Sequence, residues 1–115
     1  MTFRDDVHAI CAPLPGAEKS DPWGGGHDAW KVGGKMFACI GSVTKGISVK
    51  TDSIETAEML IETGIGTKAP YFHKSWILLP EDVAKDELRH RLETSYDIVR
   101  DSLTKKVQAA LADRT

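Results

Sequence analysis

The sequence has few of the features that mark secreted, membrane-spanning and catalytic proteins. Its two cysteines, Cys11 and Cys39, are too few for the disulfide framework of a small secreted protein. No apolar run approaches the ~20 residues that a membrane-spanning helix needs, and the acidic start at residues 2–6 does not resemble a secretory signal. These absences predict a cytoplasmic protein, and the length of 115 residues predicts one domain over residues 1–115.

Nucleotide-binding motifs are also missing, although glycine is clustered between residues 22 and 41. A P-loop needs a hydroxyl residue directly after its Gly-Lys pair, but Met36 follows Gly34-Lys35. The spacing of Gly24, Gly26 and Ala29 matches the dinucleotide fingerprint, but that fingerprint needs a strand before it and a helix after it, and here a strand follows. We therefore expect these glycines to turn the chain.

Metal and nucleophile signatures are equally weak. His8 and Cys11 stand three residues apart on one expected helix, but no second pair has the spacing of metal ligands. Ser95 has His90 nearby in sequence, but no glycine elbow surrounds it, so a packing role is expected. The sequence predicts no metal, no cofactor, no catalytic residue and no enzymatic activity.

Charge is distributed unevenly along the chain. The 17 acidic and 15 basic residues give a net charge of -2, which argues against indiscriminate binding to nucleic acid. Residues 29–50 nevertheless hold four lysines and no acid. A basic segment therefore lies inside a mildly acidic protein.

Hydrophobic periodicity and turn residues predict a two-layer α+β fold. An antiparallel sheet is expected because short turns join the sequential strands, with an N-terminal, a middle and a long C-terminal helix packed against it. The expected order is helix 2–12, a weak strand 17–20, strands 29–32, 35–40 and 45–50, helix 53–63, loop 64–70, strand 76–79, and a helix from about 82–86 to about 112.

Gly33-Gly34 predicts a tight hairpin, because both turn positions need a positive φ. The register then pairs Val32 with Lys35, Lys31 with Met36, and Trp30 with Phe37. One face would carry Trp30, Val32, Phe37 and Cys39, and the other Ala29, Lys31, Met36, Ala38 and Ile40. Both faces are partly apolar, so one of them needs a cover from the rest of the chain, a second subunit or a partner.

Aromatic and basic residues alternate between Tyr71 and Trp76. Lysines attract phosphates, and aromatic rings stack on bases or fill apolar grooves. The same pattern also arises where the aromatic residues belong to the core and the lysines are solvated. The sequence leaves both interpretations open.

Several short stretches, in this order and spacing, resemble the MmcQ/YjbR family of small bacterial proteins. They are Leu14-Pro15-Gly16, Trp30 to Ala38 with its "GGKMFA", Ser48-Val49-Lys50, the "KSWI" of Lys74 to Ile77, Ser95-Tyr96, and Leu103 to Lys106. The resemblance implies a compact α+β domain akin to the secretion-chaperone-like fold and a DNA-binding role. It also singles out Lys31, Lys35, Lys50, Lys74 and Trp76 as the expected binding surface.

Two hypotheses follow for function. In the first, the protein is a non-catalytic DNA-binding domain in which sheet lysines neutralise phosphates and aromatic residues contact bases or sugars. In the second, it is a protein- or peptide-binding module, chaperone-like or homodimeric, that uses the second, partly apolar sheet face.

Overall fold

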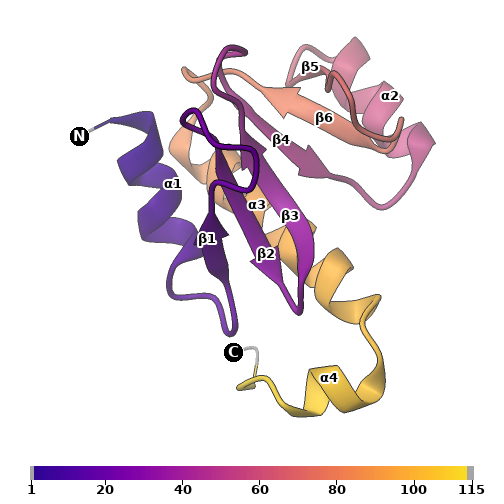
Figure 1. The fold of residues 1–115 in the computed structure, drawn as a ribbon. Helices are drawn as coiled ribbons and strands as arrows, with labels where there is room; N and C mark the ends of the chain where they lie inside the picture. The colour runs from indigo at the N-terminus through magenta and orange to yellow at the C-terminus, as the bar shows by residue number, and fades with distance from the viewer. Residues whose placement is uncertain (1, 114–115) are drawn as a thin grey trace.

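The computed structural model describes residues 2–113, in which a six-stranded sheet is packed against helices (Figure 1). None of the described helices is long and apolar enough to cross a bilayer. The elements are α1 (Phe3–Cys11), β1 (Glu18–Ser20), β2 (Asp28–Val32), β3 (Lys35–Ile40), β4 (Ile47–Lys50), α2 (Ile54–Glu62), β5 (Thr67–Lys68), β6 (Trp76–Leu79), α3 (Lys85–Asp101) and α4 (Lys105–Ala109).

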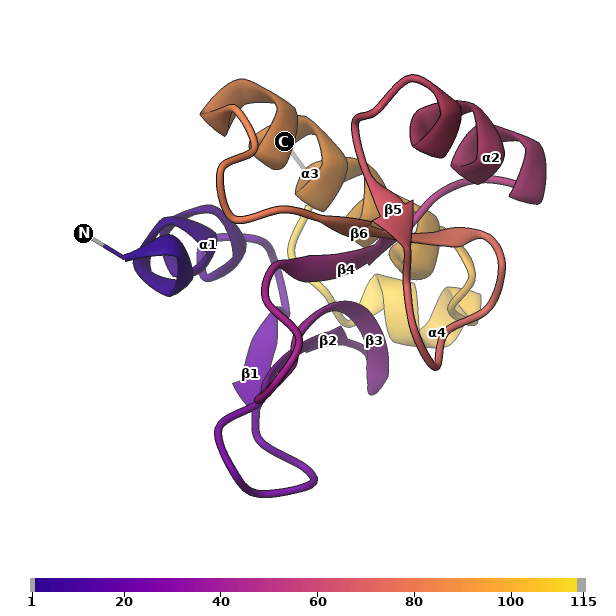
Figure 2. The ribbon, with the colours of Figure 1, turned by 90° about the horizontal axis from the view of Figure 1, so that it is seen from above.

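The strands form one sheet in the order β1-β2-β3-β4-β6-β5, and every pairing is antiparallel. Figure 2 shows α1, α2 and α3 along one side of this sheet and the β1–β2 loop on the other. The predicted α+β class and antiparallel sheet are confirmed. The segment 64–70, expected to be a loop, contains the short strand β5, which pairs with β6.

Side-chain caps fix where the first two helices begin. The Thr2 hydroxyl accepts a hydrogen bond from the Asp5 backbone N–H, and the Asp5 carboxylate accepts one from the Thr2 N–H. Ser53 caps α2 in the same way, by accepting from the Thr56 N–H. These contacts satisfy donors that the first turn of a helix leaves free, so both helices start where the sequence predicts.

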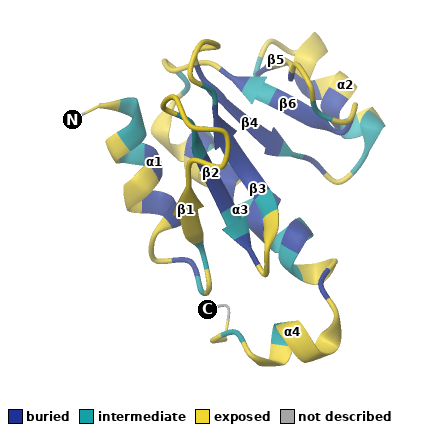
Figure 3. Ribbon diagram, in the orientation of Figure 1, coloured by how far each residue is buried: buried dark blue, intermediate teal, exposed yellow. Residues whose placement is uncertain are grey.

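The core lies between the helices and the sheet face that carries Trp30 and Val32 (Figure 3). Phe37 of β3 and Tyr96 of α3 are fully buried and meet edge to face, with ring centroids 5.4 Å apart. The Tyr96 hydroxyl donates to the Pro15 carbonyl oxygen at 2.5 Å. This hydrogen bond ties α3 to the turn before β1.

A β-bulge corrects the predicted hairpin register. Val32 pairs with Lys35 and Lys31 with Met36, as expected, but Trp30 pairs with Ala38 rather than with Phe37. The inserted residue shifts the alternation of side chains. Cys39 therefore lies on the face away from the helices, whereas Ala38 and Ile40 join Phe37 in the core, the reverse of the predicted faces for these residues.

Ser95 of α3 satisfies the backbone groups that the bulge leaves outside the strand ladder. Its fully buried hydroxyl donates to the Phe37 carbonyl oxygen at 2.5 Å and accepts from the Lys50 N–H at 2.9 Å. Unpaired backbone groups are costly when buried, so this serine holds β3, β4 and α3 together. The sequence predicts a packing role for Ser95, and in the structure this role consists of two buried hydrogen bonds.

The C-terminal helical segment is broken, not continuous to residue 112. α3 ends at Asp101, and Thr104 caps the separate helix α4 by accepting from the Val107 N–H. Between them Leu103 is buried against Gly33 of the β2–β3 turn. Apolar residues from Leu88 to Leu111 recur at spacings of three and four, which predicted one helix, but the break lets the chain bend around the end of the hairpin.

Candidate functional site

The sheet face opposite the helices, here called the outer face, is the candidate site. Cross-strand partners share a face, so the register defines which residues the outer face presents. They are Glu18, Ser20, Ala29, Lys31, Met36, Cys39, Ser48, Lys50, Thr67, Trp76 and Leu78.

A groove of about 610 Å³ is hollowed into the outer face. Its floor is made by Met36 and Cys39 of β3, Ser48 of β4 and Leu78 of β6. Its walls are three loops, which contribute Trp23 and His27, then the segment 41–44, and finally the segment 70–72. No charged side chain lines it among the described residues, so the groove suits an uncharged, largely apolar group.

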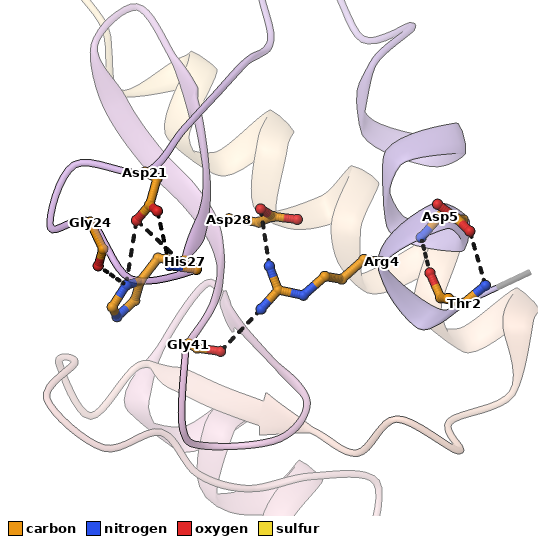
Figure 4. Close-up of polar contacts among 9 residues, drawn as sticks. Thr2, Arg4, Asp5, Asp21, Gly24, His27, Asp28 and Gly41 are labelled. Atoms are coloured by element: carbon orange, nitrogen blue, oxygen red, sulfur yellow. Dashed lines mark hydrogen bonds and ion pairs between the residues drawn. The ribbon is translucent and has the colours of Figure 1, made fainter.

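The first wall is a loop built around Asp21 (Figure 4). The Asp21 carboxylate accepts hydrogen bonds from the backbone N–H groups of Gly26, at 3.0 Å, and His27, at 3.2 Å. The hydrogen bond from Gly26 contributes most to holding the pKa of Asp21 below its usual value, and that from His27 adds to the effect. Positive φ angles at Gly24, Gly25 and Gly26 let the chain close around the carboxylate.

His27 is oriented by the same loop. Its Nδ1 lies 3.2 Å from the Gly24 carbonyl oxygen and 3.5 Å from the Asp21 carboxylate. Because a carbonyl oxygen only accepts, Nδ1 is the donor in this contact and carries a proton. The His27 ring meets Trp23 edge to face, with centroids 5.0 Å apart, so the histidine supports an indole that is 60% exposed.

Arg4 of α1 joins the first wall to the second (Figure 4). Its guanidinium forms an ion pair with Asp28 at 3.1 Å and donates to the Gly41 carbonyl oxygen at 3.3 Å. Asp28 begins β2, and Gly41 follows β3. One side chain on the helical layer thus fixes the roots of two loops that border the groove.

The third wall carries two aromatic rings in different settings. Phe72 stacks on Trp76, with ring centroids 4.5 Å apart. Tyr71 is fully exposed and has a φ of 70°, which makes it the one non-glycine residue in the described part of the chain with a left-handed backbone. Such a conformation costs an L-residue about 1–2 kcal/mol.

The structure brings together three of the five residues predicted to bind nucleic acid. Lys31 and Lys50 share the outer face with Trp76, and two strand spacings, roughly 10 Å, separate β2 from β4. Glu18 lies opposite Lys31 on β1, so an acid adjoins this lysine. Trp76 is only 8% exposed, so it supports Phe72 and offers little surface of its own.

The other two predicted residues lie elsewhere. Lys35 pairs with Val32, so it belongs to the helix side of the hairpin end and not to the outer face. Lys74 is exposed in the turn before β6. A further exposed lysine, Lys45, stands in the β3–β4 loop beside the groove segment 41–44.

Among residues 2–113, neither cysteine is an activated thiol and no cluster of metal ligands forms. Cys11 is fully buried in the core, and burial raises its pKa to about 12. Burial also raises the pKa of Cys39, with Asp28 adding to the effect, so the thiol in the groove floor is a poor nucleophile. Within residues 2–113, no three His, Cys, Asp or Glu side chains gather to hold a metal ion.

Sequence reasoning identified Tyr71 and Phe72 in the stretch up to Trp76 but missed most of the other residues that form the groove. Trp23 and His27 lie in the glycine-rich stretch that was interpreted only as a turn. Val43, which is 90% exposed, was not identified as a candidate site residue. An aromatic residue beside three consecutive glycines, with an aspartate to close the loop, is the sequence signal that could have marked the first wall.

Comparison with known proteins gives a family and a fold. The family YjbR matches residues 12–98. The crystal structure of the Deinococcus radiodurans protein DR2400, with the family domain DUF419, is similar with a TM-score of 0.84 and 24% sequence identity, over 96% of this chain and 88% of that chain. No protein of curated function matches the sequence.

Proposed function

The chain belongs to the YjbR family, and on this basis we propose that it is a non-catalytic DNA-binding protein that uses its outer sheet face. The observation that carries the proposal is the uncharged, aromatic-walled groove with lysines around it. Lysines attract phosphates, and a groove without charge accepts bases or sugars.

The charges around the groove favour an anionic ligand. Lys31 and Lys50 lie on the outer face. Two exposed lysines stand close in sequence to groove segments, Lys45 after 41–44 and Lys74 after 70–72. Two nearby acids are already engaged, because Asp21 accepts from its own loop and Asp28 is paired with Arg4. Glu18, opposite Lys31, offsets one of these positive charges, and the remaining lysines still make the surroundings of the groove more positive than the net charge of -2 suggests.

Few lysines are available, so binding is expected to be weak and sensitive to salt. Each neutralised phosphate contributes a slope of about -0.9 to log K against log salt for duplex DNA and about -0.7 for single strands. Two to four contacts thus predict a slope between about -1.5 and -3.5.

The test is fluorescence anisotropy of a labelled oligonucleotide at low and at physiological salt. The double variant Lys31→Glu with Lys50→Glu should abolish binding at physiological salt. Lys35→Glu is the matched control, because it reverses a charge on the same hairpin but on the helix side. Equal loss in both proteins, or no loss in the double variant, would place the binding surface elsewhere and refute the proposal.

A second candidate function is the binding of an apolar polypeptide segment, which the aliphatic part of the groove favours. Met36 and Leu78 form its floor, and Val43 is 90% exposed at its border. Exposed apolar surface of this kind often marks a protein interface. This function predicts a dimer or a retained protein partner whose association does not weaken with salt, measured by light scattering after size exclusion.

A further inference from the structure

We infer that the groove accepts an unpaired base, so that the protein prefers single-stranded DNA to duplex; this inference rests on the proposed function. Two aromatic residues, Trp23 and Tyr71, would contact the base, while the lysines outside the groove contact phosphates. Three independent features of the described residues support this assignment.

The first feature is the backbone of Tyr71. It follows Pro70 in a turn, where a positive φ is usually supplied by glycine or asparagine. The Tyr71 side chain is fully exposed, so no burial within the described fold compensates for the strained φ of 70°. Strained residues concentrate at ligand sites, and Tyr71 is one of the residues that line the groove.

The second feature is the support behind Trp23. His27 packs against the indole edge to face, and the Asp21 carboxylate and the Gly24 carbonyl fix the histidine in turn. A large apolar ring that is held in place and still 60% exposed loses little entropy when a flat ligand stacks on it. Trp23 and Tyr71 come from loops far apart in sequence, yet both line one groove.

The third feature is the match between the groove and a base. The described part of the chain puts no charged side chain into the lining, and a base is flat and uncharged. The groove volume of about 610 Å³ lies within the range of small-molecule sites. Bases in a duplex are paired and stacked on their neighbours, and taking one out costs a few kcal/mol. A single strand avoids this cost, so strand form should decide affinity.

The experiment compares three labelled ligands of equal length: a single strand, the same strand in duplex, and the same strand with abasic sites in the middle. The duplex has about twice as many phosphates as the single strand, so weaker binding of the duplex could not come from fewer phosphate contacts. The single strand should bind at least about tenfold more tightly than the other two. Trp23→Ala and Tyr71→Ala should each weaken single-strand binding by about tenfold, the usual effect of losing one stacking ring. The duplex and abasic affinities should change little.

Met59→Ala is the control variant, because it removes an exposed apolar side chain of α2 that does not line the groove. Circular dichroism checks that all variants remain folded. Equal binding of the three ligands, unchanged by Trp23→Ala and Tyr71→Ala, would overturn this inference but leave the proposed function intact. No binding of any ligand at low salt would refute the proposed function, and the inference with it.

Discussion

Replacing Tyr71 by glycine should stabilise the protein. Glycine adopts a φ of 70° without steric cost, so Tyr71→Gly removes about 1–2 kcal/mol of backbone strain. Glycine also gives the unfolded chain more freedom, which costs about 0.4–1 kcal/mol. Because the phenol is fully exposed, no burial is lost. The net effect is an increase of roughly 0.5–1 kcal/mol in the free energy of unfolding.

Tyr71→Ala separates strain from the loss of the ring. Alanine keeps the Cβ atom and therefore the strain, so the stability of this variant should stay within about 0.5 kcal/mol of the parent. Urea unfolding followed by circular dichroism measures the stability of both variants. The urea concentration at the midpoint of unfolding should rise for Tyr71→Gly but not for Tyr71→Ala, and the dependence of the unfolding free energy on urea should not change. If the Tyr71→Gly variant were no more stable than the Tyr71→Ala variant, the argument from backbone strain would be refuted.

Two further predictions concern buried and exposed polar groups. In urea unfolding, Ser95→Ala should lower the free energy of unfolding by about 2–4 kcal/mol, because the Phe37 carbonyl and the Lys50 N–H both lose their partner. The control Ser102→Ala removes only a hydrogen bond within one helix turn, so it should lower the free energy of unfolding by less than ~1 kcal/mol. The carboxylate of Asp21 has a lowered pKa, so its stabilisation of the 21–27 loop is present above the unfolded value of about 3.9 and is lost as pH falls through the folded pKa. NMR shifts of the Gly26 and His27 amides should follow this titration and Asp21→Asn should abolish it; amide shifts that titrate identically in the variant would contradict the assignment.

Much of the fold follows from local sequence signals. Thr2 and Ser53 mark helix starts, and Gly33-Gly34 marks the hairpin, because each depends on residues within one turn of the chain. The bulge at Phe37 is different. It is stabilised by Ser95, 58 residues away, so a register deduced from the hairpin alone assigns Cys39 to the wrong face.

The candidate site was predictable only in part. Lys31, Lys50 and the stretch around Trp76 were identified, but the sequence could not show that Lys35 belongs to the opposite face, since this depends on which face the helices cover. The groove itself combines loops from three separate segments with a floor from β3, β4 and β6. No local pattern encodes such a combination, and only the positive φ of Tyr71, invisible in sequence, distinguishes that residue from its neighbours.

The position of β6 has a consequence for the order of folding. The β2–β3 hairpin joins residues close in sequence, whereas β4 pairs Val49 with Ile77 across α2 and β5. Closing a long loop costs more entropy than closing a two-residue turn, so we expect the hairpin to form early and β6 to dock late. The groove floor needs Leu78 of β6 beside Ser48 of β4, which in turn pairs with Cys39 of the hairpin. An intermediate without docked β6 would therefore have no groove, and ligand binding should slow unfolding rather than speed folding.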